Sequence, residues 1–120
     1  MKIAFLFLLF QLSIFTNAQT CDELMEFVKN ENYGTTYRSY DSDAVSKVTF
    51  YDVSIDYQSY YFAIVCFKRN NYSYNCSEYI YQVASNTKSY YSMNYRESAG
   101  KAFWKYIQPY NETLGCAPEM

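Results

Sequence analysis

Residues 45–68 read VSKVTFYDVSIDYQSYYFAIVCFK, and this stretch decides the fold of the chain. Residues 45–55 are rich in β-branched and aromatic side chains, which favour β-strands. With the strand period of two, Val45 and Val53 share one face and Val48 and Phe50 share the other. Residues 60–68 are apolar on both faces, as expected of a central strand. The polar residues 56–59 predict a turn between the two strands.

Two further strands flank this pair in the sequence. Residues 35–40 predict a short first strand, and residues 78–84 (EYIYQVA) predict a last one. A helix is expected before the strands and two short helices after them. This segregation of strands and helices is typical of an α+β fold with the helices on one face of an antiparallel sheet. We therefore expect an N-terminal helix, an antiparallel meander of three to four strands, and two C-terminal helices packed on one face of the sheet.

The helix ends carry capping signals. Thr20 and Glu23 have the spacing of a capping box, which predicts that the first helix begins at Thr20. Ser85 is expected to cap a helix that runs through Met93, and Ser98 a helix over residues 99–107. The tail after Pro109 predicts irregular structure.

The first 18 residues resemble a cleavable export signal. Lys2 supplies a positive start, residues 3–15 are mainly apolar, and Thr16-Asn17-Ala18 offers small residues for cleavage. The apolar run is shorter than the ~20 residues that span a bilayer, which disfavours an uncleaved anchor. Cys21 allows a lipoprotein alternative, although residues 17–20 suit it poorly. We expect one exported domain, residues 19–120, secreted or periplasmic after cleavage near Ala18.

All four cysteines lie in the predicted mature domain. An even cysteine count in a small exported domain favours disulfides over metal ligands or catalytic thiols. Four cysteines allow three pairings, which the sequence alone does not separate. The preferred pairing is Cys66–Cys76, which closes a local loop, together with Cys21–Cys116, which ties the first helix to the tail.

Several classes of chemistry are disfavoured by composition. The chain has no histidine, which removes the commonest general base and zinc ligand. It has three glycines and no glycine-rich phosphate loop. Without Lys2 it carries nine basic and twelve acidic residues, a net charge of −3, which does not attract phosphate backbones. We expect no catalytic residues, no metal and no cofactor.

Order and spacing of three motifs give residues 43–107 a resemblance to the KTSC domain, a small module at the end of some lysyl-tRNA synthetases and in free-standing bacterial proteins. The strand pair over 45–68 is similar to the opening hairpin of that family. Residues 79–83 (YIYQV) match its Tyr-x-Tyr strand, and residues 98–104 (SAGKAFW) resemble its closing segment, with Trp104 where asparagine is usual. The resemblance implies an α+β fold, and its setting suggests RNA binding.

Three functions follow as hypotheses. The first is a non-enzymatic exported domain that binds a protein or a cell-envelope component, supported by the 16 tyrosines. The second is an RNA-binding module with a basic patch of Lys88, Arg96, Lys101 and Lys105. The third is a small hydrolase or enzyme inhibitor with two carboxylates in one cleft. The candidate binding residues are Tyr79, Tyr81, Lys101, Trp104 and Lys105, while most of the tyrosines are expected to fill the core of the sheet.

Overall fold

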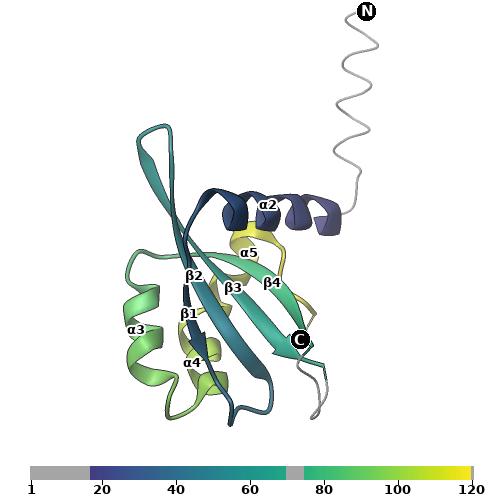
Figure 1. Cartoon of the computed structure of the whole chain (residues 1–120), viewed down its shortest axis with the longest axis vertical. Coiled ribbons are helices and arrows are strands. Elements are labelled where there is room, and N and C mark those ends of the chain that lie inside the picture. Colours follow the sequence, from purple (N-terminus) through teal and green to yellow (C-terminus); the bar gives the residue numbers. More distant parts are fainter. Residues whose placement is uncertain (1–16, 70–74, 120) are drawn as a thin grey trace, which may run out of the picture.

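Four strands form one antiparallel sheet whose spatial order follows the chain (Figure 1). The computed structural model describes residues 17–69 and 75–119. The strands are β1 (Thr35–Arg38), β2 (Val45–Ile55), β3 (Gln58–Lys68) and β4 (Cys76–Val83). This arrangement confirms the predicted meander, with β2 and β3 as its two long central strands.

A β-bulge near the start of β2 changes which residues share a face. Pairing with β3 shifts between Val45, opposite Phe67, and Lys47, opposite Cys66. The extra residue puts Val45 into the same buried cluster as Val48 and Phe50. The prediction that Val45 and Val53 share a face is therefore wrong, because strict alternation does not continue through a bulge.

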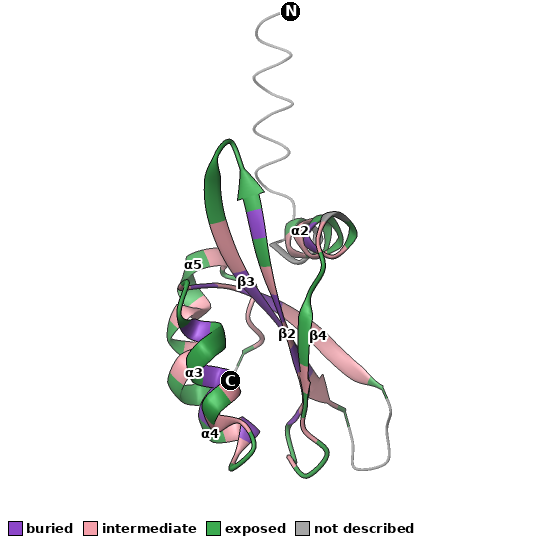
Figure 2. Cartoon of the chain, turned by 60° about the vertical axis from the view of Figure 1, so that its left-hand side comes forward, coloured by how far each residue is buried: buried purple, intermediate pink, exposed green. Residues whose placement is uncertain are grey.

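The turn between β2 and β3 is shorter than predicted. Ile55 pairs with Gln58, which leaves only Asp56 and Tyr57 as the loop. Their φ angles are 52° and 68°, so both residues have left-handed backbone, as in a type I′ hairpin turn. The hairpin end is exposed and projects beyond the rest of the sheet (Figures 1 and 2).

The two predicted C-terminal helices, α3 (Thr87–Asn94) and α4 (Ala99–Tyr106), cover one face of the sheet. The Ser98 side chain accepts a hydrogen bond from the Lys101 amide, which confirms the predicted cap of α4. The prediction for Ser85 is wrong, since the N-cap position of α3 is Asn86. Instead, the Thr87 hydroxyl accepts a hydrogen bond from the Ala84 amide and shapes the turn from β4 into the helix.

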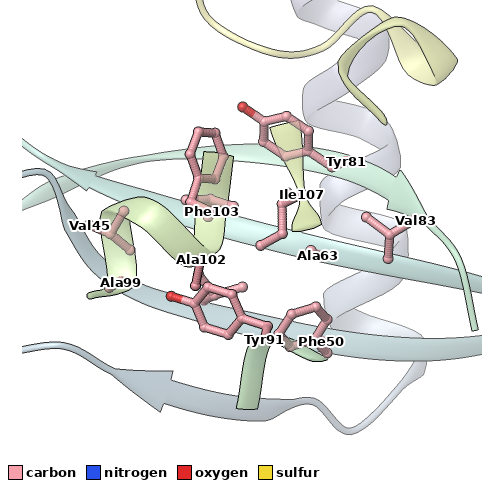
Figure 3. Close-up of a cluster of buried hydrophobic side chains, with 12 residues drawn as sticks. Val45, Phe50, Ala63, Tyr81, Val83, Tyr91, Ala99, Ala102, Phe103 and Ile107 are labelled. Atoms are coloured by element: carbon pink, nitrogen blue, oxygen red, sulfur yellow. The ribbon is translucent and has the colours of Figure 1, made fainter. Parts of the chain in front are cut away.

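Aromatic rings fill the space between these helices and the sheet (Figure 3). The Phe103 ring meets those of Phe67 and Tyr81 edge to face, with centroids 5.1 Å and 5.6 Å away. Tyr91 of α3 packs against Phe50 at 5.6 Å. Such ring pairs add to the stabilisation that comes from burying apolar area.

The first helix, α2 (Asn17–Glu31), lies across the opposite face (Figure 1). Its Val28 is fully buried with Val53, Phe62, Ile64 and Ile80. The expectation that all helices share one face is therefore wrong for this helix. The predicted start is also wrong, because α2 begins at Asn17 and Thr20 lies inside its first turn.

The tail is more regular than predicted. A 3₁₀ turn, η1 (Gln108–Tyr110), leads into a short helix, α5 (Asn111–Leu114). Leu114 packs against the α2 side of the sheet. Gly115 then reverses the chain with a φ of 68°, a conformation that glycine adopts without strain.

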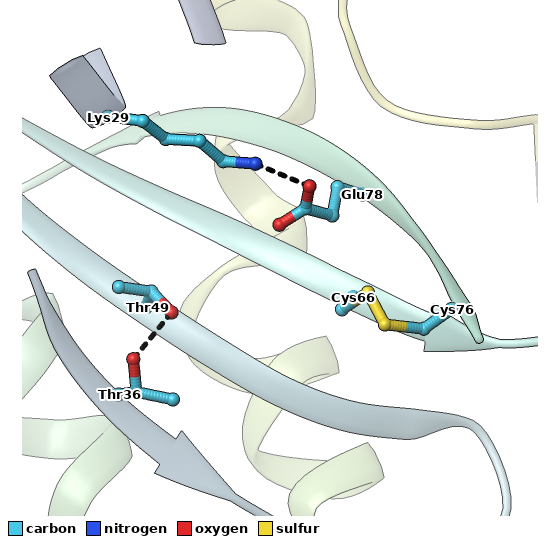
Figure 4. Close-up of polar contacts among 6 residues, drawn as sticks. All are labelled: Lys29, Thr36, Thr49, Cys66, Cys76 and Glu78. Carbon is cyan, nitrogen blue, oxygen red and sulfur yellow. Dashed lines mark hydrogen bonds and ion pairs between the residues drawn. A yellow bond between two sulfur atoms is a disulfide. The ribbon is translucent and has the colours of Figure 1, made fainter. Parts of the chain in front are cut away.

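Both preferred disulfide pairings are confirmed. Cys66–Cys76 joins β3 to β4 across a Cα–Cα distance of 5.3 Å (Figure 4). Cys21–Cys116 joins α2 to the segment after α5 across 5.7 Å. Two disulfides in so small a domain fit an oxidising compartment such as the cell exterior or the periplasm.

The predicted signal peptide is not tested by these features, because residues 1–16 lie outside the described part. None of the described helices is long and apolar enough to span a bilayer.

Candidate functional site

Helix α4 presents two different sides. Its inward side places Ala99, Ala102 and Phe103 on the sheet, where all three are buried. At 100° per residue, Lys101, Trp104 and Lys105 fall on the outward side, and all three are exposed. The helix therefore displays the three C-terminal residues of the predicted binding set.

A groove of about 280 Å³ runs between α3 and α4. Lys101, Lys105 and Tyr106 line it from α4, and Asn94 lines it at the end of α3. Glu97, in the connection between the helices, also lines it. The volume is below the ~300–1,000 Å³ of typical small-molecule sites, so the groove suits one or two side chains of a larger partner.

Two stacked tyrosine rings lie beside the lysines. Tyr90 of α3 and Tyr106 of α4 stack with centroids 5.4 Å apart and planes 9° from parallel. The Lys105 ammonium nitrogen is 5.4 Å from the Tyr106 centroid, within the range of a cation–π contact. Tyr90 remains 44 % exposed, so part of its ring is open to a ligand.

The groove lysines have no carboxylate partner in the described residues. Among the described residues, the ion pair is formed by Lys29 and Glu78, which lie on the opposite face of the sheet (Figure 4). Lys101 and Lys105 are exposed, and Glu97 is the one acidic residue that lines the groove. The groove thus offers two unpaired cations next to an aromatic surface.

The five predicted binding residues do not form one surface. Tyr79 and Tyr81 lie on the sheet face that α3 and α4 cover, and Tyr81 is 1 % exposed and packs on Phe103. Its ring therefore faces the core. Trp104 is 55 % exposed and contacts Phe103, but it does not line the groove. Lys101 and Lys105 are the two that the structure brings together.

Sequence reasoning missed Tyr90 and Tyr106 as surface partners. They are 16 positions apart in the chain, and their stacking depends on how α3 and α4 cross the sheet. The i, i+4 spacing of Lys101 and Lys105 was a usable signal for one shared side of α4. Nothing in the sequence placed Tyr90 opposite them.

The four basic residues proposed to bind RNA do not form one patch. Arg96 lines a separate open cavity of about 480 Å³, between the β1–β2 loop and the connection from α3 to α4. That cavity also contains Arg38 and the carboxylates of Asp41, Asp43 and Glu97. Lys88 lines neither hollow. The basic patch is thus reduced to the two lysines of the groove.

Two buried tyrosine hydroxyls lie in the core under the helices. Tyr81 Oη and Tyr91 Oη are buried without a hydrogen-bond partner. Burial raises the pKa of both hydroxyls above the usual range. These groups are neutral at physiological pH and belong to the core beneath the helices, not to the groove.

No cluster of three or more metal-ligating side chains occurs in the described part of the chain. The resemblance to the KTSC domain stays a prediction. Comparison with family models, with curated proteins and with solved structures finds no match to this chain.

Proposed function

We propose that this chain acts, after export, as a non-enzymatic binding domain whose α3–α4 groove holds an acidic segment of a partner protein or cell-envelope component. The observation that carries the proposal is the pair of lysines without an ion-pair partner, Lys101 and Lys105, beside the Tyr90–Tyr106 stack, of which Tyr90 is exposed. Tyrosine rings give large contact area at low entropic cost and are enriched where proteins bind one another.

The size and charge of the groove narrow the ligand class. Its volume admits individual side chains and not a whole cofactor. Two lysines favour carboxylates, and the tyrosine stack favours a neighbouring aromatic or apolar side chain. A segment that alternates acidic and aromatic residues satisfies both requirements.

The test uses the mature, oxidised domain and two probes of equal charge at low salt. One probe is an eight-residue peptide of alternating Glu and Tyr, and the other is a short single-stranded oligouridine. Amide shifts by NMR report where each binds. We expect saturable peptide binding at α3 and α4, weakened at least fivefold in Lys101→Gln/Lys105→Gln. The matched control, Lys88→Gln, should bind as the parent does.

Other results would change the assignment. Saturable oligouridine binding without peptide binding would replace the proposal with the RNA-binding hypothesis. Shifts confined to other elements, or equal affinity in the double variant, would remove the groove as the contact surface. Because salt screens exposed charges, affinity should also fall as salt is raised.

A further inference from the structure

The outer half of the β2–β3 hairpin, residues 52–60, forms an arm that we call the hairpin arm. We propose that its β2 edge is a docking site for an extended, basic segment of another protein, which adds to the sheet as a strand. This surface is separate from the α3–α4 groove, and the inference does not depend on the proposed function.

Unlike the rest of β2 and β3, the hairpin arm has no neighbouring described strand on either side. Pairing of β1 with β2 ends at Thr35 opposite Phe50, and pairing of β4 with β3 ends at Val83 opposite Tyr61. Beyond these points β2 and β3 pair only with each other, and the arm extends past the sheet (Figure 1). Among the described strands, none pairs with its outer edges.

The hydrogen-bond pattern shows which backbone groups are open. Ile55 and Gln58 flank the two-residue turn and bond to each other, so alternate positions point outward. On β2 these are Asp52 and Ser54. On β3 the outward position within the unpaired stretch is Ser59. The β2 edge is the longer of the two and continues the line of β1.

The turn keeps an exposed tyrosine where glycine fits better. Positions with φ of 52° and 68° in a type I′ turn favour asparagine and glycine, yet Asp56 and Tyr57 occupy them. Tyr57 is 108 % exposed, so no packing within the domain holds it there. Strained backbone that the fold does not require points to a role in binding. Ile55, 39 % exposed, adds apolar surface beside it.

The acidic residues of the hairpin arm favour a basic partner segment. Between Val48 and Phe67 the only charged residues are Asp52 and Asp56, both exposed. Edge strands usually carry lysine or proline, which hinder pairing with other chains, and this arm has neither. Two arms from two copies would bring four carboxylates together, which disfavours self-association. A basic segment instead pairs its cations with both aspartates while its backbone bonds to β2.

The experiment titrates the oxidised mature domain with an eight-residue peptide of alternating Lys and Val. NMR reports chemical shifts and amide exchange. We expect saturable binding and at least tenfold slower exchange of the Ser54 amide. A Glu-Val peptide of the same length should not bind. Equal binding of a Lys-Gly peptide would overturn the proposal, because it would indicate charge attraction without strand addition.

Proline variants test the edge itself. Ser54→Pro removes the outward amide of β2 without removing a bond to β3, so the fold should persist while affinity falls at least tenfold. Ser59→Pro makes the same change on the β3 edge and should bind as the parent does. Weaker binding in Ser59→Pro but not in Ser54→Pro would overturn the assignment to β2. Peptide-independent dimers that Ser54→Pro abolishes would overturn it in favour of self-pairing.

Tyr57→Gly tests whether the strained turn lowers stability while it contributes to peptide binding. Glycine relieves the left-handed backbone, so the melting temperature should rise while peptide affinity falls at least threefold. Tyr57→Asn, which tolerates the same φ, should also lose affinity. Unchanged affinity in both variants would remove Tyr57 from the docking site. These outcomes are independent of the Lys101 and Lys105 variants.

Discussion

On the face that α3 and α4 cover, side-chain packing holds the helices to the sheet. Twelve buried residues form that cluster, and its rings meet one another repeatedly. On the α2 face the buried cluster has five residues, and the Cys21–Cys116 disulfide and the Lys29–Glu78 pair supplement it. The contrast shows that a small domain can cover two sheet faces with one large core when a covalent link secures the thinner side.

Matched phenylalanines give the sharpest test of this contrast. Phe103 and Phe62 are 1 % and 4 % exposed, on the helical and α2 faces respectively. Truncation of a core phenylalanine costs ~3–5 kcal/mol. We expect Phe103→Ala near the top of that range, because it loses three ring contacts, and Phe62→Ala near the bottom. Urea unfolding followed by circular dichroism measures both, and equal losses would contradict the contrast.

Removing the Cys21–Cys116 disulfide should weaken the α2 face selectively. Cys21–Cys116 spans 95 residues and Cys66–Cys76 spans 10. Loop entropy then predicts losses of about 4–5 and about 3 kcal/mol for the two double alanine variants. Hydrogen exchange should rise first in α2 without Cys21–Cys116, while α3 and α4 stay protected. Uniform loss of protection would show that the two faces unfold together.

Buried hydroxyls are a weak point of the helical face. Tyr91→Phe removes an unpartnered buried hydroxyl and should raise the free energy of unfolding by ~1 kcal/mol. The raised pKa values also predict alkaline instability. The unfolded tyrosines ionise near pH ~10 and the buried ones resist, so stability is complete below that pH and falls above it.

Melting temperatures between pH 8 and pH 11.5 measure this effect. The Tyr81→Phe/Tyr91→Phe variant should show a shallower alkaline decline than the parent. Tyr40→Phe is the control, because its ring is 84 % exposed. A decline as steep in the double variant as in the parent would contradict the assignment to these two hydroxyls.

The smallest effect is expected at the end of the β1–β2 pairing. There Arg38 of β1 lies directly opposite Lys47 of β2, and like charges in this position repel. Arg38→Glu should raise the free energy of unfolding by ~0.2–1 kcal/mol, and Arg38→Gln by less. Denaturant unfolding at low salt checks the order of the three proteins. A loss of stability in Arg38→Glu would show that repulsion between Arg38 and Lys47 does not lower the stability of the parent.

Much of this architecture could be predicted from residue patterns. The two long strands, the Ser98 cap and both disulfides follow from local composition and cysteine position. The face occupied by Val45 could not be predicted, because a bulge depends on cross-strand bonds. An apolar stripe predicts that α2 is buried but does not say against which face. That choice depends on the path of the whole chain.

The candidate site was predicted only in part. Lys101 and Lys105 share a helix side, which helical spacing gives directly. The Tyr90–Tyr106 stack depends on the distance between α3 and α4, which the rings beneath them set. Tyr81 shows the opposite case. Its alternation with Tyr79 allowed either a binding face or a place in the core, and burial under Phe103 makes it a core residue.

The Cys21–Cys116 link also has a mechanical consequence. Tension applied to the segments that flank these two cysteines passes through the sulfur–sulfur bond and bypasses the sheet. A single oxidised molecule stretched from those segments should give almost no extension on unfolding. After reduction, the same pull should release the 95-residue separation, roughly 330 Å of extended chain. The oxidation state of this one disulfide thus decides whether the domain extends under tension.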